Sequence, residues 1–202
     1  MKKINIRIGV IVVMICLAAL SRLLPHPYNF SPLVAMALFG GAQFHKKWQA
    51  YLIPLGAFLV SDIVLQLSGQ MGVYSFSQPF VIVSQLFVYA SMVLVTLLGT
   101  SLKNPKAIKI LGYSLTGSAI FWIISNFGVW LGNSFADGTL TYEPGLTLGL
   151  TYLRALPFYN MMGTEMFVNA FLGDLFYSAA LFGVFALVQK NIRVLHYTTA
   201  GR

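Results

Sequence analysis

The residues of this chain that could do chemistry are few, and the most informative are two aspartates inside apolar stretches. Asp62 and Asp174 each stand within a long apolar run. An ionised carboxylate at membrane depth costs at least about 2.5 kcal/mol, so such a group normally faces the protein interior and has a partner. Arg22, at the end of the first apolar run, is the cation we expect beside Asp62. The alternative is that both aspartates only cap or pair with neighbouring helices.

No catalytic motif accompanies these aspartates. The chain lacks the nucleophile elbow, the zinc-protease helix, the phosphate-binding loop and the dinucleotide-binding glycines. Cys16 is a lone cysteine, and the three histidines are too scattered for a metal site. An intramembrane enzyme would have to rely on a loose cluster of His26, Arg22 and Asp62. We therefore predict no enzyme, no catalytic residue, no metal and no cofactor.

Other polar residues gather toward one end of the predicted helices. Asn126 and Trp130 are four residues apart and share a helix face, as do Glu165 and Asn169. Aromatic walls with a few convergent polar groups are typical of a small-molecule site. Alternatively, the polar groups satisfy one another and Trp130 is an anchor at the membrane interface. The predicted substrate-binding residues are Arg22, His26, Asn29, Asp62, Asn126, Trp130, Glu165, Asn169 and Asp174.

The composition places these residues in a membrane protein. Of 202 residues, 57% are hydrophobic and only 9% are charged, against about 25% charged in ordinary soluble domains. The net charge of +8 does not indicate nucleic-acid binding, because the cations are spread between apolar runs and not gathered in one patch. The lipid bilayer is thus the first predicted partner.

Apolar runs predict an all-α bundle of six transmembrane helices in a single domain, residues 1–202. A crossing needs about 20 apolar residues, and the second run is short, although Ser31 as a cap and Pro32 at the first helical position would mark its start. The predicted spans are about 8–24, 32–44, 48–67, 79–102, 107–131 and 162–188.

Charge supports the short second span. With six crossings, 11 of the 13 cations fall on the side of the N-terminus, as the positive-inside rule requires of the cytoplasmic side. Without the second span, Lys46 and Lys47 would lie outside. We therefore predict that both termini are cytoplasmic. A cleaved signal peptide remains an alternative for the first run, since it has a basic start and small residues at its end.

The longest connection, residues 132–161, separates the last two spans. It contains an apolar piece, residues 146–156, that is too short to cross and therefore predicts an interfacial or re-entrant segment. Long loops over a binding site often act as lids. We expect ligand to enter from outside, to contact His26, Asn29, Asn126 and Asn169, and to be covered by part of this connection.

Several motifs resemble an uncharacterised family of bacterial integral membrane proteins described as transport proteins. The resemblance covers about residues 22–183 and rests on RLLPHPYNFSPLVAMALFGGAQF, PLGAFLVSDIVLQ, LRALPFYN and FLGDLFYSAALFG. It implies a multi-pass protein of the bacterial cytoplasmic (inner) membrane. The positions that match the family's motifs are Arg22, Pro25, His26, Pro27, Asn29, Asp62, Gly173 and Asp174, and the resemblance assigns no role to any of them.

In size and layout that family is similar to the substrate-binding S-components of energy-coupling-factor vitamin transporters. This similarity implies capture of a small molecule, such as a vitamin or cofactor precursor, from an outward-facing pocket, together with a transmembrane energising partner driven by ATPases. The first span lacks the Ala-x-x-x-Ala docking pattern of S-components; Ala37 and Gly41 in the second span are the nearest pair of small residues at this spacing. The alternative function is a non-transporting assembly or scaffold subunit of a membrane complex.

Overall fold

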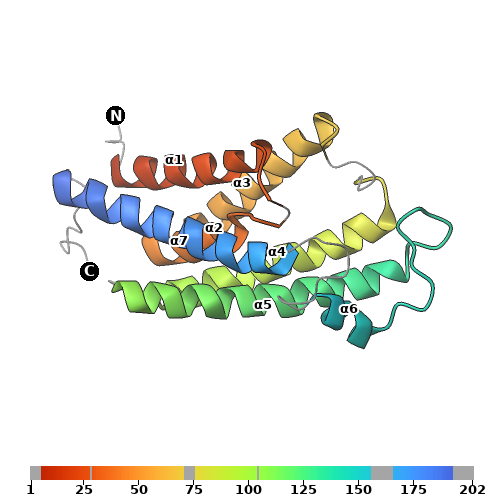
Figure 1. The fold of residues 1–202 in the computed structure, drawn as a ribbon. Helices are drawn as coiled ribbons and strands as arrows, with labels where there is room; N and C mark the ends of the chain where they lie inside the picture. The colour runs from red at the N-terminus through yellow and green to blue at the C-terminus, as the bar shows by residue number, and fades with distance from the viewer. Residues whose placement is uncertain (1–5, 28, 71–75, 104, 156–165, 193–202) are drawn as a thin grey trace.

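The computed structural model describes residues 6–27, 29–70, 76–103, 105–155 and 166–192, with side chains described from residue 170 in the last range. All regular structure in these ranges is helical. The helices form one elongated bundle (Figure 1). Their bounds are α1 Ile6–Leu20, η1 Ser21–Leu23, α2 Leu33–Gln43, α3 Lys47–Leu67, α4 Pro79–Thr100, α5 Ala107–Asn133, α6 Leu148–Arg154 and α7 Met166–Asn191.

Five of these helices are long and apolar enough to cross a membrane: α1 with η1, α3, α4, α5 and α7. They correspond to five of the six predicted spans, and the structure thus supports a multi-pass membrane protein. The remaining predicted span is α2, which has only 11 residues. At 1.5 Å per residue its length is about 16 Å, roughly half of the hydrocarbon core.

Helix α2 lies at the centre of the bundle and contacts α1, α3, α4, α5 and α7. Every residue of 33–41 is buried, so α2 is apolar all round, as a helix enclosed by other helices must be. Its first turn meets the middle of the neighbouring helices, because the side chain of Val34 lies against Gly117 of α5. The described residues of the preceding segment, 24–27 and 29–32, lie between the end of α1 and this point (Figure 1). The expected cap is wrong: Pro32, and not Ser31, is the N-cap, and no side chain caps the helix.

Glycines set the spacing between α2 and α4. A Cβ on Gly41 would meet the backbone oxygen of Thr96, and it would stand 3.0 Å from the Cα of Gly99. A Cβ on Gly99 would in turn stand 2.5 Å from the backbone oxygen of Leu38. Two backbones can approach this closely only where side chains are absent. The small residues of the second predicted span therefore serve packing within this chain.

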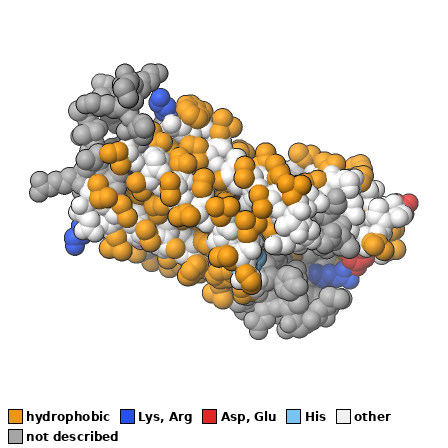
Figure 2. Space-filling view, turned by 90° about the horizontal axis from the view of Figure 1, so that it is seen from above, with side chains coloured by type: hydrophobic (Ala, Val, Ile, Leu, Met, Phe, Trp, Pro, Cys, Tyr) orange, Lys and Arg blue, Asp and Glu red, His pale blue; other side chains and the backbone are white. Residues whose placement is uncertain are grey.

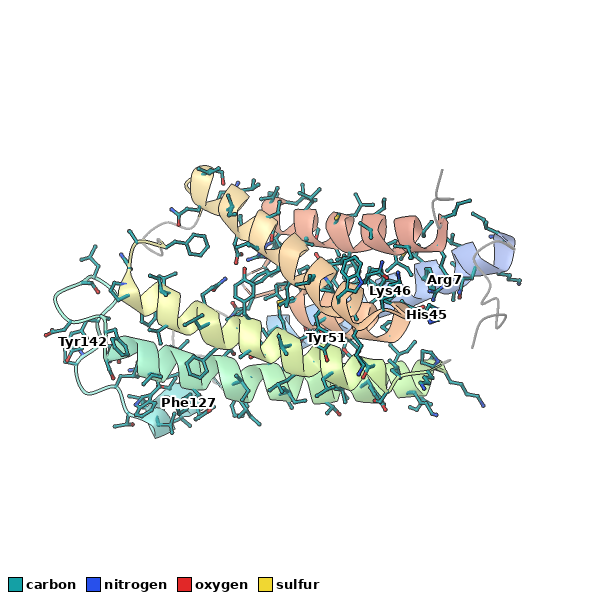
Figure 3. All side chains as sticks on the ribbon, turned by 180° about the vertical axis from the view of Figure 1, so that it is seen from behind. Arg7, His45, Lys46, Tyr51, Phe127 and Tyr142 are labelled. Carbon is teal, nitrogen blue, oxygen red and sulfur yellow. The ribbon has the colours of Figure 1, made fainter. Side chains whose placement is uncertain are left out.

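Cationic side chains gather at the end of the bundle where α1 begins, as the labelled Arg7, His45 and Lys46 show in Figure 3. Arg7 is buried, donates to the backbone oxygen of Gln43 at 2.8 Å and lies 5.5 Å from the centre of the Phe185 ring. Partial burial and the Arg7 guanidinium lower the pKa of His45. The start of α1 and the end of α7 thus share one end of the molecule.

The face shown in Figure 2 is apolar over its middle, and charged side chains lie toward its two ends. Large hydrophobic side chains stand exposed on several helices, among them Leu17, Leu52, Leu86 and Leu187 at 62–63% exposure. Such an apolar belt is what a bilayer-facing surface requires.

Candidate functional site

A cavity of about 640 Å³ lies in the half of the bundle that α2 leaves unfilled. Its floor includes Leu33 and Val34 of the first turn of α2, and its walls come from segment 22–31 and from α3, α4, α5 and α7. The volume falls within the range of small-molecule sites, about 300–1,000 Å³. The shortness of α2 therefore creates the space that a sixth full-length helix would fill.

One wall of the cavity carries a buried ion pair. Arg22 donates to Oδ1 of Asp62 at 2.6 Å and to the Ser61 hydroxyl at 2.5 Å. Gln85 of α4 donates to the other oxygen, Oδ2. The Asp62 side chain is 1% exposed and that of Arg22 is 15% exposed, and the guanidinium lies 4.6 Å from the centre of the Phe58 ring. The expected pairing of Arg22 with Asp62 is confirmed.

Segment 21–31, which carries Arg22, is held against α7. The Ser21 and Tyr177 hydroxyls are 2.8 Å apart, and the Phe30 ring packs on Tyr177 with centres 5.7 Å apart. A Cβ on Gly173 would stand 3.0 Å from the Ser31 nitrogen, so the absence of a side chain at this position lets the segment approach α7. Asn29 has φ 61°, a left-handed conformation that asparagine tolerates better than most residues.

The opposite wall carries Asp174 of α7, which is 6% exposed. Its Oδ2 lies 2.6 Å from the Ser118 hydroxyl of α5. Ser118 is also 3.0 Å from the Ser114 backbone oxygen, and the Ser114 hydroxyl is 3.1 Å from that of Ser178. Within the described ranges, the ion pairs are Arg22–Asp62 and Arg154–Glu143, and neither includes Asp174.

Hydrogen bonds hold helix α6 against α5. Trp122 donates to the Ala155 backbone oxygen and Tyr152 donates to the Ile123 backbone oxygen, both at 2.6 Å. Partial burial raises the pKa of the Tyr152 hydroxyl, which keeps it a donor. Arg154 pairs with Glu143 of the preceding loop. The described part of the expected lid, residues 132–155, does not line the cavity, and residues 156–161 lie outside the described residues.

The structure brings six of the nine predicted binding residues to this one cavity. They are Arg22, His26, Asn29, Asp62, Asn126 and Asp174. Trp130 does not line the cavity; its ring packs on Phe127 with centres 5.5 Å apart. Glu165 and the side chain of Asn169 lie outside the described part of the chain.

Several residues that line the cavity were not predicted from the sequence. Gln85, Ser118 and Ser125 are single polar residues in apolar helices, and Phe121 and Trp122 look like ordinary membrane aromatics. A lone amide such as Gln85 inside a membrane span is the one signal that could have been used, because an amide there needs a hydrogen-bond partner.

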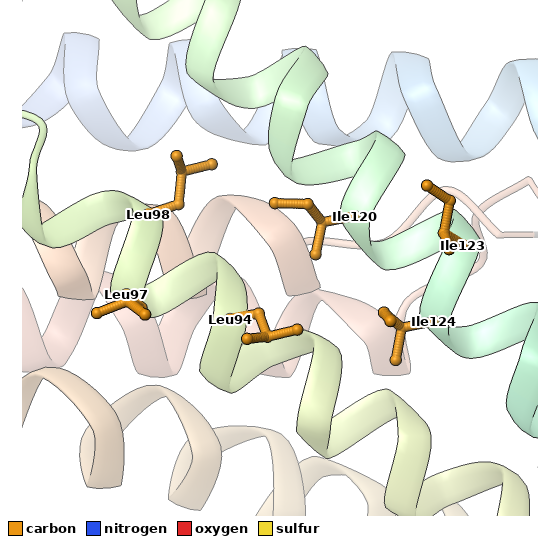
Figure 4. A pocket seen from close by; sticks show the side chains of 6 residues that line it. All are labelled: Leu94, Leu97, Leu98, Ile120, Ile123 and Ile124. Atoms are coloured by element: carbon orange, nitrogen blue, oxygen red, sulfur yellow. The ribbon is translucent and has the colours of Figure 1, made fainter.

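A second hollow lies on the surface between α4 and α5 (Figure 4). Six leucine and isoleucine side chains line it, from Leu94 to Ile124. It has no charged or hydrogen-bonding side chain and it lies in the apolar belt, so an acyl chain of the bilayer fits it. The polar cavity is the candidate site.

Comparison with known proteins adds a family but no activity. A family model described as "Family of unknown function (DUF6580)" matches residues 2–195. No curated protein and no solved structure matches the chain.

Proposed function

The chain belongs to this family of unknown function, and we propose that it is a membrane transporter or the substrate-binding subunit of one. In this proposal it captures a small molecule in the cavity between α2 and the ends of the longer helices. The observation that carries the proposal is the cavity itself: about 640 Å³, with aromatic walls and buried polar groups on opposite sides. A subunit that only joins other proteins has no need of such a space.

The proposed topology has six crossings, of which residues 24–32 and α2 together make the second. In support, α1 and α3 run in the same direction along the bundle (Figure 1), so the chain must return between them. The described lysines and Arg7 lie at or next to the helix ends opposite the cavity (Figure 1), and cytoplasmic loops carry such an excess of cations. Both termini are then cytoplasmic, and the cavity opens to the outside of the bacterial cytoplasmic membrane.

Active transport of the bound molecule into the cytoplasm would need a source of energy outside the described fold. The likeness to vitamin-transporter S-components, stated from the sequence, favours a transmembrane partner driven by ATPases. An ion gradient is the other source. In the half of the bundle away from the cavity, the Phe39 ring packs on Phe182 and Phe185, with centres 5.2 and 5.5 Å away. Transport through this half would require these helices to move.

The proposal is tested by an unbiased mass-spectrometric search for small molecules retained by the purified protein. Val129→Trp, which places a large ring in the cavity wall, should abolish retention. The matched control is Leu97→Trp, which adds the same ring to the apolar groove on the surface and should leave retention unchanged. A stoichiometric protein partner without any retained molecule would instead support the assembly or scaffold function.

A further inference from the structure

Asp174 is a buried carboxyl group that belongs to neither ion pair of the described residues. It lines the cavity and is 6% exposed. Both oxygens of Asp62 already accept hydrogen bonds, from Arg22 and Gln85. A carboxylate buried without a cation is costly, so the charge state of Asp174 must be explained by its own surroundings.

The hydrogen bonds around Ser118 answer that question. A hydroxyl has one proton to donate. The Ser118 hydroxyl lies 3.0 Å from the backbone oxygen of Ser114, four residues earlier, which is the usual acceptor for a helical serine. It also donates to Oδ2 of Asp174 at 2.6 Å, so its one proton serves two acceptors. One shared hydrogen bond does not offset the cost of burying an ionised carboxylate, and a buried carboxyl group without a cation takes up a proton instead.

Among the described residues, neither α7 nor the helices packed against it place a cation beside Asp174; Lys190 is in the last turn of α7. Helix α2 has no charged residue, and the charged residue of α5, Lys109, is exposed in its first turn. Arg7 of α1 lies at the far end, over Phe185. The other titratable groups that line the cavity are Arg22, Asp62 and His26. Of the two that are basic, Arg22 is paired with Asp62 and His26 is exposed.

We propose that the cavity takes an organic ammonium ion, which replaces the proton on Asp174. This inference rests on the proposed function and names the class of molecule that the cavity binds. As the cation enters, the O–H bond of the carboxyl group breaks, the proton leaves through the cavity to solvent, and the carboxylate pairs with the ammonium group. One positive charge enters and one leaves. Phe121, Trp122 and Phe171 line the same space and suit an apolar or aromatic body beside the cation.

Dicyclohexylcarbodiimide tests the protonated state, because it adds to a protonated carboxyl group and rearranges to a stable acylurea. In the purified full-length protein, we expect one adduct, on the peptide that contains Asp174, and none in Asp174→Asn. Asp62 is an internal control: it lines the same cavity but is ionised by Arg22, so it should stay unlabelled. No adduct on Asp174, or equal labelling of both aspartates, would overturn the proposal.

Protection from this reagent tests the cation. We expect 2-phenylethylammonium, at about ten times its Kd, to slow labelling of Asp174 about tenfold by occupancy, and the neutral 2-phenylethanol to have no such effect. Equal protection by both compounds, or none by the ammonium ion, would contradict a cation site. If the mass-spectrometric search meanwhile found a retained anion or neutral molecule, the proposed function would stand and this inference alone would fail.

Discussion

At the scale of single residues, the network around Asp62 illustrates how a buried charge is tolerated. The carboxylate accepts from Arg22, and from Gln85 on a different helix, and Arg22 also reaches Ser61. Removing one member of such a pair leaves the other buried and unmatched, which costs more than the pair itself contributes.

We predict strong coupling between Arg22 and Asp62. Asp62→Asn should lower the free energy of unfolding by about 3 kcal/mol, the usual loss on breaking a buried pair. Combined with Arg22→Gln, the loss should be smaller than the two single losses added, by about 1–3 kcal/mol. Denaturation of the purified protein in detergent measures all three variants.

The pair Arg154–Glu143 serves as the control for this cycle. Its side chains are 32% and 42% exposed, and exposed pairs contribute at most about 1 kcal/mol. Additive losses at Arg22 and Asp62, similar to those at this exposed pair, would show that the buried network is not coupled.

Part of the site was predictable from residue chemistry alone. The cost of an unpaired Asp62 in an apolar run pointed to Arg22, and the structure confirms that pair. The Ser118 contact of Asp174 was not predictable, because serines are common in apolar helices and periodicity does not say which one faces a carboxylate. Trp130 does not line the cavity beside Asn126, because sharing a helix face does not determine which neighbour the larger ring meets.

At the scale of elements, α2 decides the architecture. The sequence predicts its bounds to within one residue, 32–44 against Leu33–Gln43, and predicts α4 and α5 to within two. It does not predict that α2 begins at mid-bundle, because that depends on the return of residues 24–32 alongside α7. A hydrophobic run reports burial, but it does not say whether lipid or protein surrounds the helix.

We predict that Gly41→Ala destabilises the fold. The added Cβ would meet the backbone of α4 at Thr96 and Gly99, and a backbone cannot move aside as a side chain can. The expected loss is about 1–3 kcal/mol, typical of overpacking. Thermal unfolding in detergent measures it.

Gly112→Ala is the matched control, since a Cβ at Gly112 meets nothing within 4 Å. This substitution should raise stability by up to about 1 kcal/mol, because alanine favours the helix more than glycine does. A neutral or stabilising effect at Gly41 as well would mean that α2 and α4 are not packed as closely as described.

At the scale of the whole molecule, both the charge and the shape differ between the two ends of the bundle. Arg7 and Lys46 lie at one end of the bundle, and the cavity lies toward the other. The sequence predicts this asymmetry from counting cations. The lining of the cavity becomes visible only in the three-dimensional structure, because it comes from residues as far apart in the chain as Arg22 and Asp174.

The six-crossing topology predicts the location of reporter fusions. Reporters joined after residues 104 and 202 should read as cytoplasmic, and those near residues 72 and 140 as external, because 11 of the 13 cations then lie inside. An external reading at residue 104 would mean that residues 24–32 and α2 do not return the chain across the membrane.

The central claim, a small-molecule cavity open to the outside, is tested most directly by thiol labelling in intact cells. In a Cys16→Ser background, Asn126→Cys places a single thiol in the cavity wall, and Ser114→Cys places one at a fully buried position below Ser118. A small membrane-impermeant thiosulfonate added outside should modify the cysteine at position 126 and not the one at position 114. Modification at position 126 only after the membrane is opened to the cytoplasmic side would contradict the account.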